Sequence, residues 1–296
     1  MATMLIFRQL SLLSLIALCL YLCWLAVSWG LADREANNAH QILSSWEKGT
    51  PFSRDALATA INHNRAAISL DPNNARYRNR IARLLLIKLI VDDDTEAGQE
   101  ALDHLRHARA IRPAYAGSYA IFAETKYRLN EFDTEMFESI ELATQKGPWE
   151  EQVLQIITRT GLASYGSLPK TTQNAVIKTI ARGLSSPVHG LPRRVFSIMK
   201  EEVNGWTLEF VASLVDTLKH YAWPSRSTAI VTELSVLLWP LLSEKDKTEL
   251  PPRLSELIAG SSSPDSALRI IADARLLPHF CPWLPRDQVF SRRCAF

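Results

Sequence analysis

The sequence lacks the short motifs with which enzymes commonly bind phosphates or activate a nucleophile. It contains no Gly-x4-Gly-Lys phosphate loop, no Gly-x-Gly-x-x-Gly dinucleotide fingerprint and no Gly-x-Ser-x-Gly nucleophile elbow. A strong charge of one sign is also missing, because 33 Lys and Arg residues face 31 Asp and Glu residues. Scattered, balanced charge produces no long-range field that attracts nucleic acid. We therefore expect no nucleic-acid partner and no small-molecule cofactor.

Cysteine is scarce, and none of the 4 cysteines belongs to a Cys-x-x-Cys pair. Cys19 and Cys23 lie in an apolar run, and each follows a leucine, where a lipoprotein site needs a small residue. Cys281 and Cys294 lie near the carboxyl end. Two free buried thiols are the favoured interpretation of this pair, and a disulfide is the alternative if the body faces an oxidising periplasm.

Charged side chains are absent from Gln9 to Ala32, a run long enough to cross a bilayer as a helix. A secretory signal has a shorter apolar stretch, of roughly 7 to 15 residues, so a retained anchor is favoured. Gly30-Leu31-Ala32 leaves a cleaved signal open, because such a triplet suits a cleavage site. Trp24 and Trp29 fit the aromatic belt of a membrane interface.

The predicted organisation has four parts: a short cytoplasmic tail (1–8), a transmembrane anchor (9–32), helical repeats (33–165) and a helical carboxy-terminal region (166–296). Arg8 precedes the anchor, whereas Arg34 and Lys48 follow it. The positive charges on the two sides are therefore nearly equal, and the positive-inside rule does not decide the orientation. The short tail is easier to leave in the cytoplasm than the long body. We therefore expect a single-pass protein of a bacterial inner membrane with its body in the periplasm.

The body is predicted to be all-α, because Ala and Leu recur at helical spacing from Ser53 onward and turn-forming residues lie between the apolar stretches. An internal repeat supports this prediction: an alanine is followed five residues later by a proline in Ala67–Pro72, Ala108–Pro113 and Ala143–Pro148. The prolines recur every 35 to 41 residues, roughly the length of a helix–turn–helix unit. In such a unit the alanine packs against the preceding helix and the proline ends its own helix.

This pattern resembles the tetratricopeptide repeat. Between Pro113 and Pro148, the residues Tyr119, Phe122 and Ala123 lie at the spacing of the family's aromatic, large and small positions. The match is degenerate, because Ala123 replaces the expected glycine and Glu135 occupies a place where a small residue is usual. The upstream unit has Arg78, Ile81, Ala82 and Leu85 at the corresponding places.

A second resemblance covers more of the chain. The segments that carry it are Ala67–Tyr77, Ala101–Pro113, Tyr127–Asp133, Gly147–Glu150 and Gly161–Gly183, which follow an amino-terminal span. In this order they resemble the VpsP family of polysaccharide-biosynthesis-cluster proteins. The resemblance implies partners among polymerase, glycosyltransferase or export components of an exopolysaccharide pathway. The matching segments carry scaffold residues and no catalytic signature.

Beyond Leu184 we expect further helices, at 192–202, 206–220, 227–242, 243–259 and 265–277. Gly260 to Pro264 predicts a flexible loop, and Pro278 to Phe296 an irregular cap over the preceding helices.

Two clusters of potential metal ligands have plainer structural interpretations. His104 and His107 lie one helical turn apart, but two ligands do not make a metal site, so we expect a solvated helix face. Asp92-Asp93-Asp94 with Glu96 lacks the glycine of an ion-binding loop, so it predicts a helix end followed by an amino-terminal cap.

A basic cluster could meet lipid head groups or an anionic saccharide, although a solvated helix face is favoured; its members are Arg76, Arg78, Arg80 and Arg83. We assign no catalytic, cofactor-binding or metal-binding residue, and expect Tyr119, Phe122 and Trp149 to be packing positions. The favoured function is a membrane-anchored, non-enzymatic scaffold of exopolysaccharide biosynthesis or export. A general cell-envelope adaptor is the alternative, and an enzyme hidden in residues 191–296 is the third.

Overall fold

The computed structural model describes residues 2–186, 188, 190–202, 208–218, 232–233, 235–236, 239–241, 244–259, 264–284 and 294. Throughout these residues the chain forms helices and turns and no strand, which confirms the predicted all-α fold. The chain divides into two compact units, Met1–Ala114 and Tyr115–Phe296.

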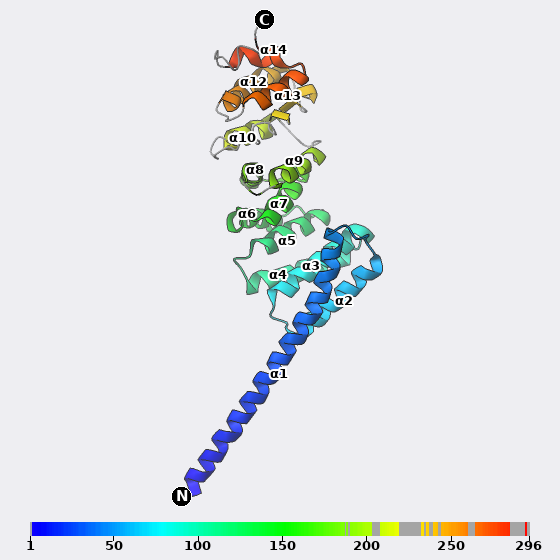
Figure 1. Cartoon of the computed structure of the whole chain (residues 1–296), viewed down its shortest axis with the longest axis vertical. Helices are drawn as coiled ribbons and strands as arrows, with labels where there is room; N and C mark the ends of the chain where they lie inside the picture. Colours follow the sequence, from blue (N-terminus) through cyan, green and yellow to red (C-terminus); the bar gives the residue numbers. More distant parts are fainter. Residues whose placement is uncertain are drawn as a thin grey trace. The chain divides into compact units, whose positions relative to one another are not determined.

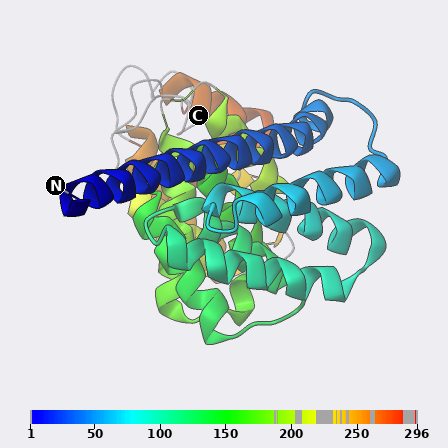
Figure 2. The same ribbon diagram turned by 90° about the horizontal axis from the view of Figure 1, so that it is seen from below.

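The first unit is built from four helices: α1 (Ala2–Glu47), α2 (Arg54–Leu70), α3 (Ala75–Asp92) and α4 (Thr95–Ile111). Consecutive helices lie side by side, and the amino-terminal half of α1 projects alone beyond the other three (Figures 1 and 2). The helix does not stop at Ala32, where the apolar run ends, because Asp33, Arg34 and Glu35 change the hydropathy without breaking helical backbone geometry. The apolar helix that the sequence predicts to span a membrane and the first helix of the body are therefore one element.

The second unit is a series of shorter helices. They are α5 (Ala116–Arg128), α6 (Thr134–Lys146), α7 (Glu151–Ala163), η1 (Tyr165–Ser167), α8 (Lys170–Ser185), α9 (Leu191–Glu201), α10 (Leu208–Leu218), η3 (Trp239–Leu241), α12 (Glu244–Ala259), α13 (Pro264–Asp273), α14 (Leu277–Phe280) and η4 (Cys281–Trp283). One hydrophobic core runs through them, with Met136, Ile157 and Leu254 among its fully buried side chains. Gly161 brings α7 close to α8, because a β-carbon at this position would collide with Val176.

The three Ala–Pro repeats end their helices in the same way. The backbone N–H of Asp71, Arg112 and Gly147 donates to the carbonyl oxygen of Ala67, Ala108 and Ala143, at 3.0, 2.9 and 3.0 Å respectively. All three alanines are fully buried, and each helix ends before the proline. The predicted helix ends and the predicted packing of the alanines are confirmed.

Two of the three expected packing positions are confirmed. Tyr119 is 8% exposed and Phe122 is fully buried. Trp149 is 54% exposed, so its prediction was wrong. The residue lies in the turn between α6 and α7, where the chain has left one helix and not yet begun the next, and its indole ring is directed partly to solvent.

The predicted carboxy-terminal helices at 192–202, 206–220 and 243–259 correspond to α9, α10 and α12 within a few residues. The predicted helix at 265–277 is shorter, because α13 ends at Asp273 and Arg275 adopts a left-handed backbone with φ of 59°. Most of the predicted helix at 227–242, the loop at 260–263 and most of the predicted cap after Leu284 lie outside the described residues.

Candidate functional site: the joint between α1 and its neighbouring helices

The apolar part of α1 continues into the body, where one buried stripe on α1 packs against the neighbouring helices. The stripe consists of Ser28, Ala32, Ala36, Ala39 and Leu43, spaced three or four residues apart. This spacing keeps side chains on one face of a helix. Small side chains allow two helix backbones to approach closely, and Ala32 and Ala36 pack with Ala67 and Tyr77 of the neighbouring helices. We call this packed contact of α1 with α2 and α3 the joint.

Four polar contacts fasten α1 to α2 and α3. The Ser28 hydroxyl donates to the Leu70 carbonyl oxygen at 2.9 Å, at the end of α2. The Tyr77 hydroxyl donates to the Asp33 carboxylate at 2.7 Å, and His63 Nδ1 lies 2.6 Å from Glu35 Oε2. These contacts place α2 antiparallel to α1, because residues later in α2 meet residues earlier in α1.

The fourth contact comes from Arg80, whose guanidinium donates to the carbonyl oxygen of Ala36 at 2.5 Å. Burial and the nearby Arg76 lower the pKa of Arg80 below its usual value. Burial, followed by the hydrogen bond to Asp33, raises the pKa of Tyr77 to about 12. Both shifts have the same physical origin, which is that the joint removes polar groups from water.

The predicted solvated face of the basic cluster is therefore wrong for three of its four arginines, which are half-buried. Arg80 is half-buried against α1, and Arg78 donates to the Pro72 carbonyl oxygen at 3.0 Å. Arg76 is exposed, as expected, and Arg83 is half-buried. Sequence reasoning missed this role because both acceptors are backbone carbonyls, which leave no trace in the side-chain pattern.

The projecting part of α1 is apolar on all sides. Its exposed large side chains are Leu12, Leu13, Leu15, Ile16, Leu18, Leu20, Tyr21, Leu22, Trp24, Val27, Trp29 and Leu31. This helix is long and apolar enough to cross a membrane, and it differs from a core helix in that its apolar part is largely exposed. Cys19 and Cys23 lie on this exposed part as free cysteines.

His104 and His107 do not share a site. Arg78 donates to His104 Nδ1 at 3.4 Å, and His104 Nε2 lies 3.6 Å from Glu100. His104 is half-buried, so the predicted solvated face is wrong for this residue; burial, opposed by Glu100, lowers its pKa. His107 is exposed, and its Nδ1 lies 3.1 Å from the carbonyl oxygen of Asp103.

The aspartate run caps helices as predicted. The Asp94 side chain accepts from the backbone N–H of Ala97 at 2.9 Å at the start of α4 and also pairs with Lys88 at 2.6 Å. Asp92 pairs with Arg54, and Asp93 ends α3 in a left-handed conformation. Within the described part of the chain, no group of three or more His, Cys, Asp or Glu residues is placed to hold a metal ion.

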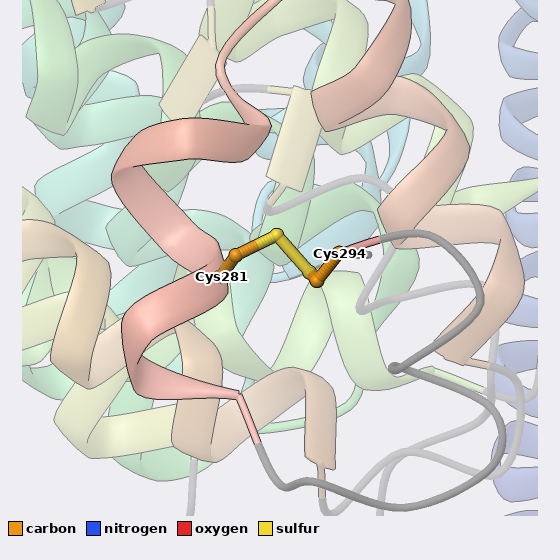
Figure 3. The surroundings of a disulfide bond; sticks show 2 residues. All are labelled: Cys281 and Cys294. Atoms are coloured by element: carbon orange, nitrogen blue, oxygen red, sulfur yellow. A yellow bond between two sulfur atoms is a disulfide. The ribbon is translucent and has the colours of Figure 1, made fainter. Parts of the chain in front are cut away.

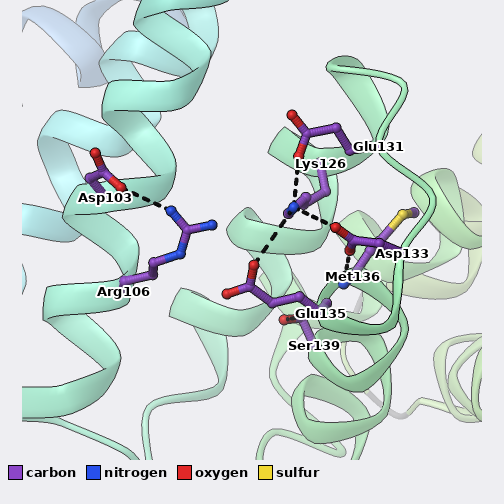
Figure 4. A network of polar contacts seen from close by, with 8 residues as sticks. All are labelled: Asp103, Arg106, Lys126, Glu131, Asp133, Glu135, Met136 and Ser139. Carbon is purple, nitrogen blue, oxygen red and sulfur yellow. Dashed lines mark hydrogen bonds and ion pairs between the residues drawn. The ribbon is translucent and has the colours of Figure 1, made fainter.

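A buried lysine organises the hairpin of α5 and α6 (Figure 4). Lys126 is 4% exposed, and its ammonium group donates to Glu131 at 2.6 Å and to Asp133 at 2.7 Å, with Glu135 at 3.6 Å. Burial alone would lower the pKa of Lys126, but the hydrogen bonds to Asp133 and Glu131 outweigh it and raise the pKa. Asp133 also accepts from the backbone N–H of Met136 and caps α6.

This network accounts for a departure from the repeat pattern. Glu135 stands where a small residue is usual, and the structure shows it beside the Lys126 ammonium. All three carboxylates belong to the same hairpin as the lysine, so the network stabilises the turn and needs no ligand. Sequence reasoning did not identify Lys126, although acidic residues five, seven and nine positions later were a signal. The same view shows a separate surface pair, Arg106 and Asp103, at 2.9 Å (Figure 4).

Cys281 and Cys294 form a disulfide (Figure 3). Their α-carbons are 5.5 Å apart, so the favoured prediction of two free thiols was wrong and the alternative holds. Phe280 and Leu284, which flank η4, are buried and fix the turn that carries Cys281. Cys294 packs against the same core. Disulfides persist in oxidising compartments such as the periplasm.

The candidate site is thus a joint, whose side chains fasten α1 to α2 and α3. No protein-family model matches this chain, and no curated protein matches its sequence.

Proposed function

We propose that this chain is a non-enzymatic scaffold of exopolysaccharide biosynthesis or export, anchored in the bacterial inner membrane by α1. The observation that carries the proposal is the joint: α1 enters the body without a linker and is fastened there by the buried stripe and four polar contacts. A tether of this kind confines the body to the membrane and raises its effective concentration for membrane partners.

The helical hairpins supply the recruiting surface in this proposal. Paired helices that resemble tetratricopeptide repeats build extended faces for a peptide or a partner helix. The equivalent ends of α2, α4 and α6 support a repeat origin for these hairpins. The polysaccharide pathway depends on the resemblance to the VpsP family, through segments such as Ala67–Tyr77 and Ala101–Pro113. The partners proposed are a polymerase, a glycosyltransferase or an export component.

We place the body in the periplasm. The Cys281–Cys294 disulfide supports this orientation, because cytosolic thiols are kept reduced. Carboxy-terminal fusions to alkaline phosphatase and to a cytoplasmic fluorescent protein test it. Phosphatase activity without fluorescence is expected, and fluorescence without phosphatase activity contradicts the orientation.

Affinity capture of the full-length protein from gently solubilised membranes tests the function. The control is a chain that keeps α1 but ends after the α1–α2 loop, so that contacts made by the anchor alone are subtracted. Enrichment of polysaccharide polymerase, glycosyltransferase or export proteins over this control is expected. Enrichment of unrelated envelope proteins would replace the proposal with a general cell-envelope adaptor, and no enrichment would refute recruitment by the body.

A further inference from the structure

The four-helix unit carries opposite charges at its two ends. We define the proximal end as segments 28–36, 63–80 and 102–114, which lie where α1 leaves the body, and the distal end as segments 41–59 and 87–100. Proximal charged residues are Arg34, Arg65, Arg76, Arg78, Arg80, Arg106, Arg109 and Arg112, with Asp33, Glu35, Asp71 and Asp103. Distal charged residues are Glu47, Asp55, Asp92, Asp93, Asp94, Glu96 and Glu100, with Lys48, Arg54 and Lys88. The proximal end is therefore basic and the distal end acidic.

Contacts between the helices establish which segments share the proximal end. Ser28 of α1 meets Leu70 at the end of α2, so the turn at residues 71–74 lies beside the emerging membrane helix. Arg78 near the start of α3 meets His104 of α4. At a rise of 1.5 Å per residue, α4 extends beyond the start of α3 by about 6 Å. Arg112, which follows α4, therefore lies at the same end as this turn.

With α1 as the proposed membrane anchor, its length puts the proximal end at the membrane surface. Residues 9–27 form about 28 Å of helix, which matches the hydrocarbon core of a bilayer, about 30 Å thick. The hydrocarbon cannot extend much past Val27, because the polar turn Asp71–Asn74 would then enter it beside Ser28. The proximal end thus begins at the interface, within a Debye length, about 8 to 10 Å, of the head groups.

Helix dipoles do not explain the basic residues fully. Arg109 occupies the last turn of α4, where a cation is favoured in any case. Arg76 occupies the first turn of α3, where the dipole disfavours a cation. Arg76 and Arg112 are both exposed, whereas Arg80 is half-buried and donates to the Ala36 carbonyl oxygen. A negatively charged surface next to the proximal end would stabilise a cation at the position of Arg76.

We propose that the proximal end binds the phosphate groups of anionic phospholipids in the leaflet from which α1 emerges. The inference rests on the proposed anchoring by α1. Arginines near an anionic surface each strengthen binding by about fivefold. Because α1 continues unbroken into the first unit and packs against its other helices, these contacts set the height and tilt of this unit above the membrane.

Hydrogen exchange of the full-length protein in nanodiscs tests the inference. The nanodiscs contain phosphatidylcholine alone or phosphatidylcholine with phosphatidylglycerol. The anionic lipid is expected to slow exchange about fivefold or more in peptides covering 70–77 and 107–114. Distal peptides covering 48–56 and 90–97 are expected to be unchanged.

Paired variants with equal loss of charge provide the control. Arg76→Gln with Arg112→Gln is expected to weaken binding about 25-fold and so to remove most of the slowing by phosphatidylglycerol. Lys48→Gln with Arg54→Gln, at the distal end, is expected to retain it. Equal slowing in both double variants would overturn the inference.

Two further outcomes separate this inference from the anchoring on which it rests. If the chain does not enter nanodiscs, anchoring itself fails. If it enters and phosphatidylglycerol slows nothing, anchoring stands and the binding of anionic lipid is refuted. Inorganic phosphate added to phosphatidylcholine nanodiscs should have no effect, and slowing by phosphate would assign the site to a soluble anion.

Discussion

Replacing Ala36 with leucine should open the joint between α1 and the body. Ala36 is 2% exposed and packs with Ala67 and Tyr77, so three added carbons have no space. Overpacking of this kind costs about 1 to 3 kcal/mol. Separation of the helices also weakens the hydrogen bond from Arg80 to the Ala36 carbonyl oxygen, which costs about 1 kcal/mol more. We therefore expect the free energy needed to separate α1 from α2 and α3 to fall by about 2 to 4 kcal/mol.

Hydrogen exchange of residues 33–47 in nanodiscs measures this loss. Since about 1.4 kcal/mol is a factor of ten, protection should fall about 30- to 700-fold. The matched control is Ala58→Leu on the exposed face of α2, where a surface change should stay within about 0.5 kcal/mol. Unchanged protection in Ala36→Leu, or an equal fall in both variants, would refute the close packing of the joint.

Three other perturbations follow from local contacts. Gly161→Ala should destabilise the second unit by about 1 to 3 kcal/mol in urea unfolding, because the new methyl meets Val176, whereas Gly166→Ala, with open space around it, should be neutral. The pKa of Tyr77 is raised from 10.0 to about 12 in the folded protein, so its contribution to stability is complete below pH 10 and is lost as the pH rises to 12. Denaturation measured at stepped pH should show a smaller loss of stability over this range in Asp33→Asn, because the hydrogen bond to Asp33 contributes to the raised pKa. Reduction of the carboxy-terminal disulfide, which spans 13 residues, should cost about 3 kcal/mol, and a variant with both cysteines replaced by serine should not respond to reductant.

The sequence was most informative where local chemistry decides the structure. The Ala–Pro pattern predicted the ends of α2, α4 and α6, because proline ends a helix whatever surrounds it. The acidic run predicted the cap at Asp94 for the same reason. The apolar run predicted the projecting part of α1, since length and hydropathy alone decide whether a helix can span a membrane.

Contacts between distant residues could not be predicted in the same way. Arg80 binds a backbone carbonyl of α1, and no side-chain pattern marks that acceptor. The Cys281–Cys294 disulfide depends on how η4 and Cys294 pack against the core, which spacing does not determine. The extension of α1 to Glu47 was missed because a change in hydropathy at Asp33 was treated as a boundary, although charged residues continue a helix readily.

The unbroken α1 fixes the rotation of its exposed apolar part about the helix axis relative to the body. Each helical residue turns the chain by about 100°, so one residue inserted between Val27 and Ser28 would rotate the exposed apolar side chains by that angle relative to the packed face against α2. Seven inserted residues would complete almost two full turns and restore the angle while raising the body by about 10 Å. A partner that binds both the apolar part of α1 and the body must therefore match the rotation of α1 about its axis as well as its length.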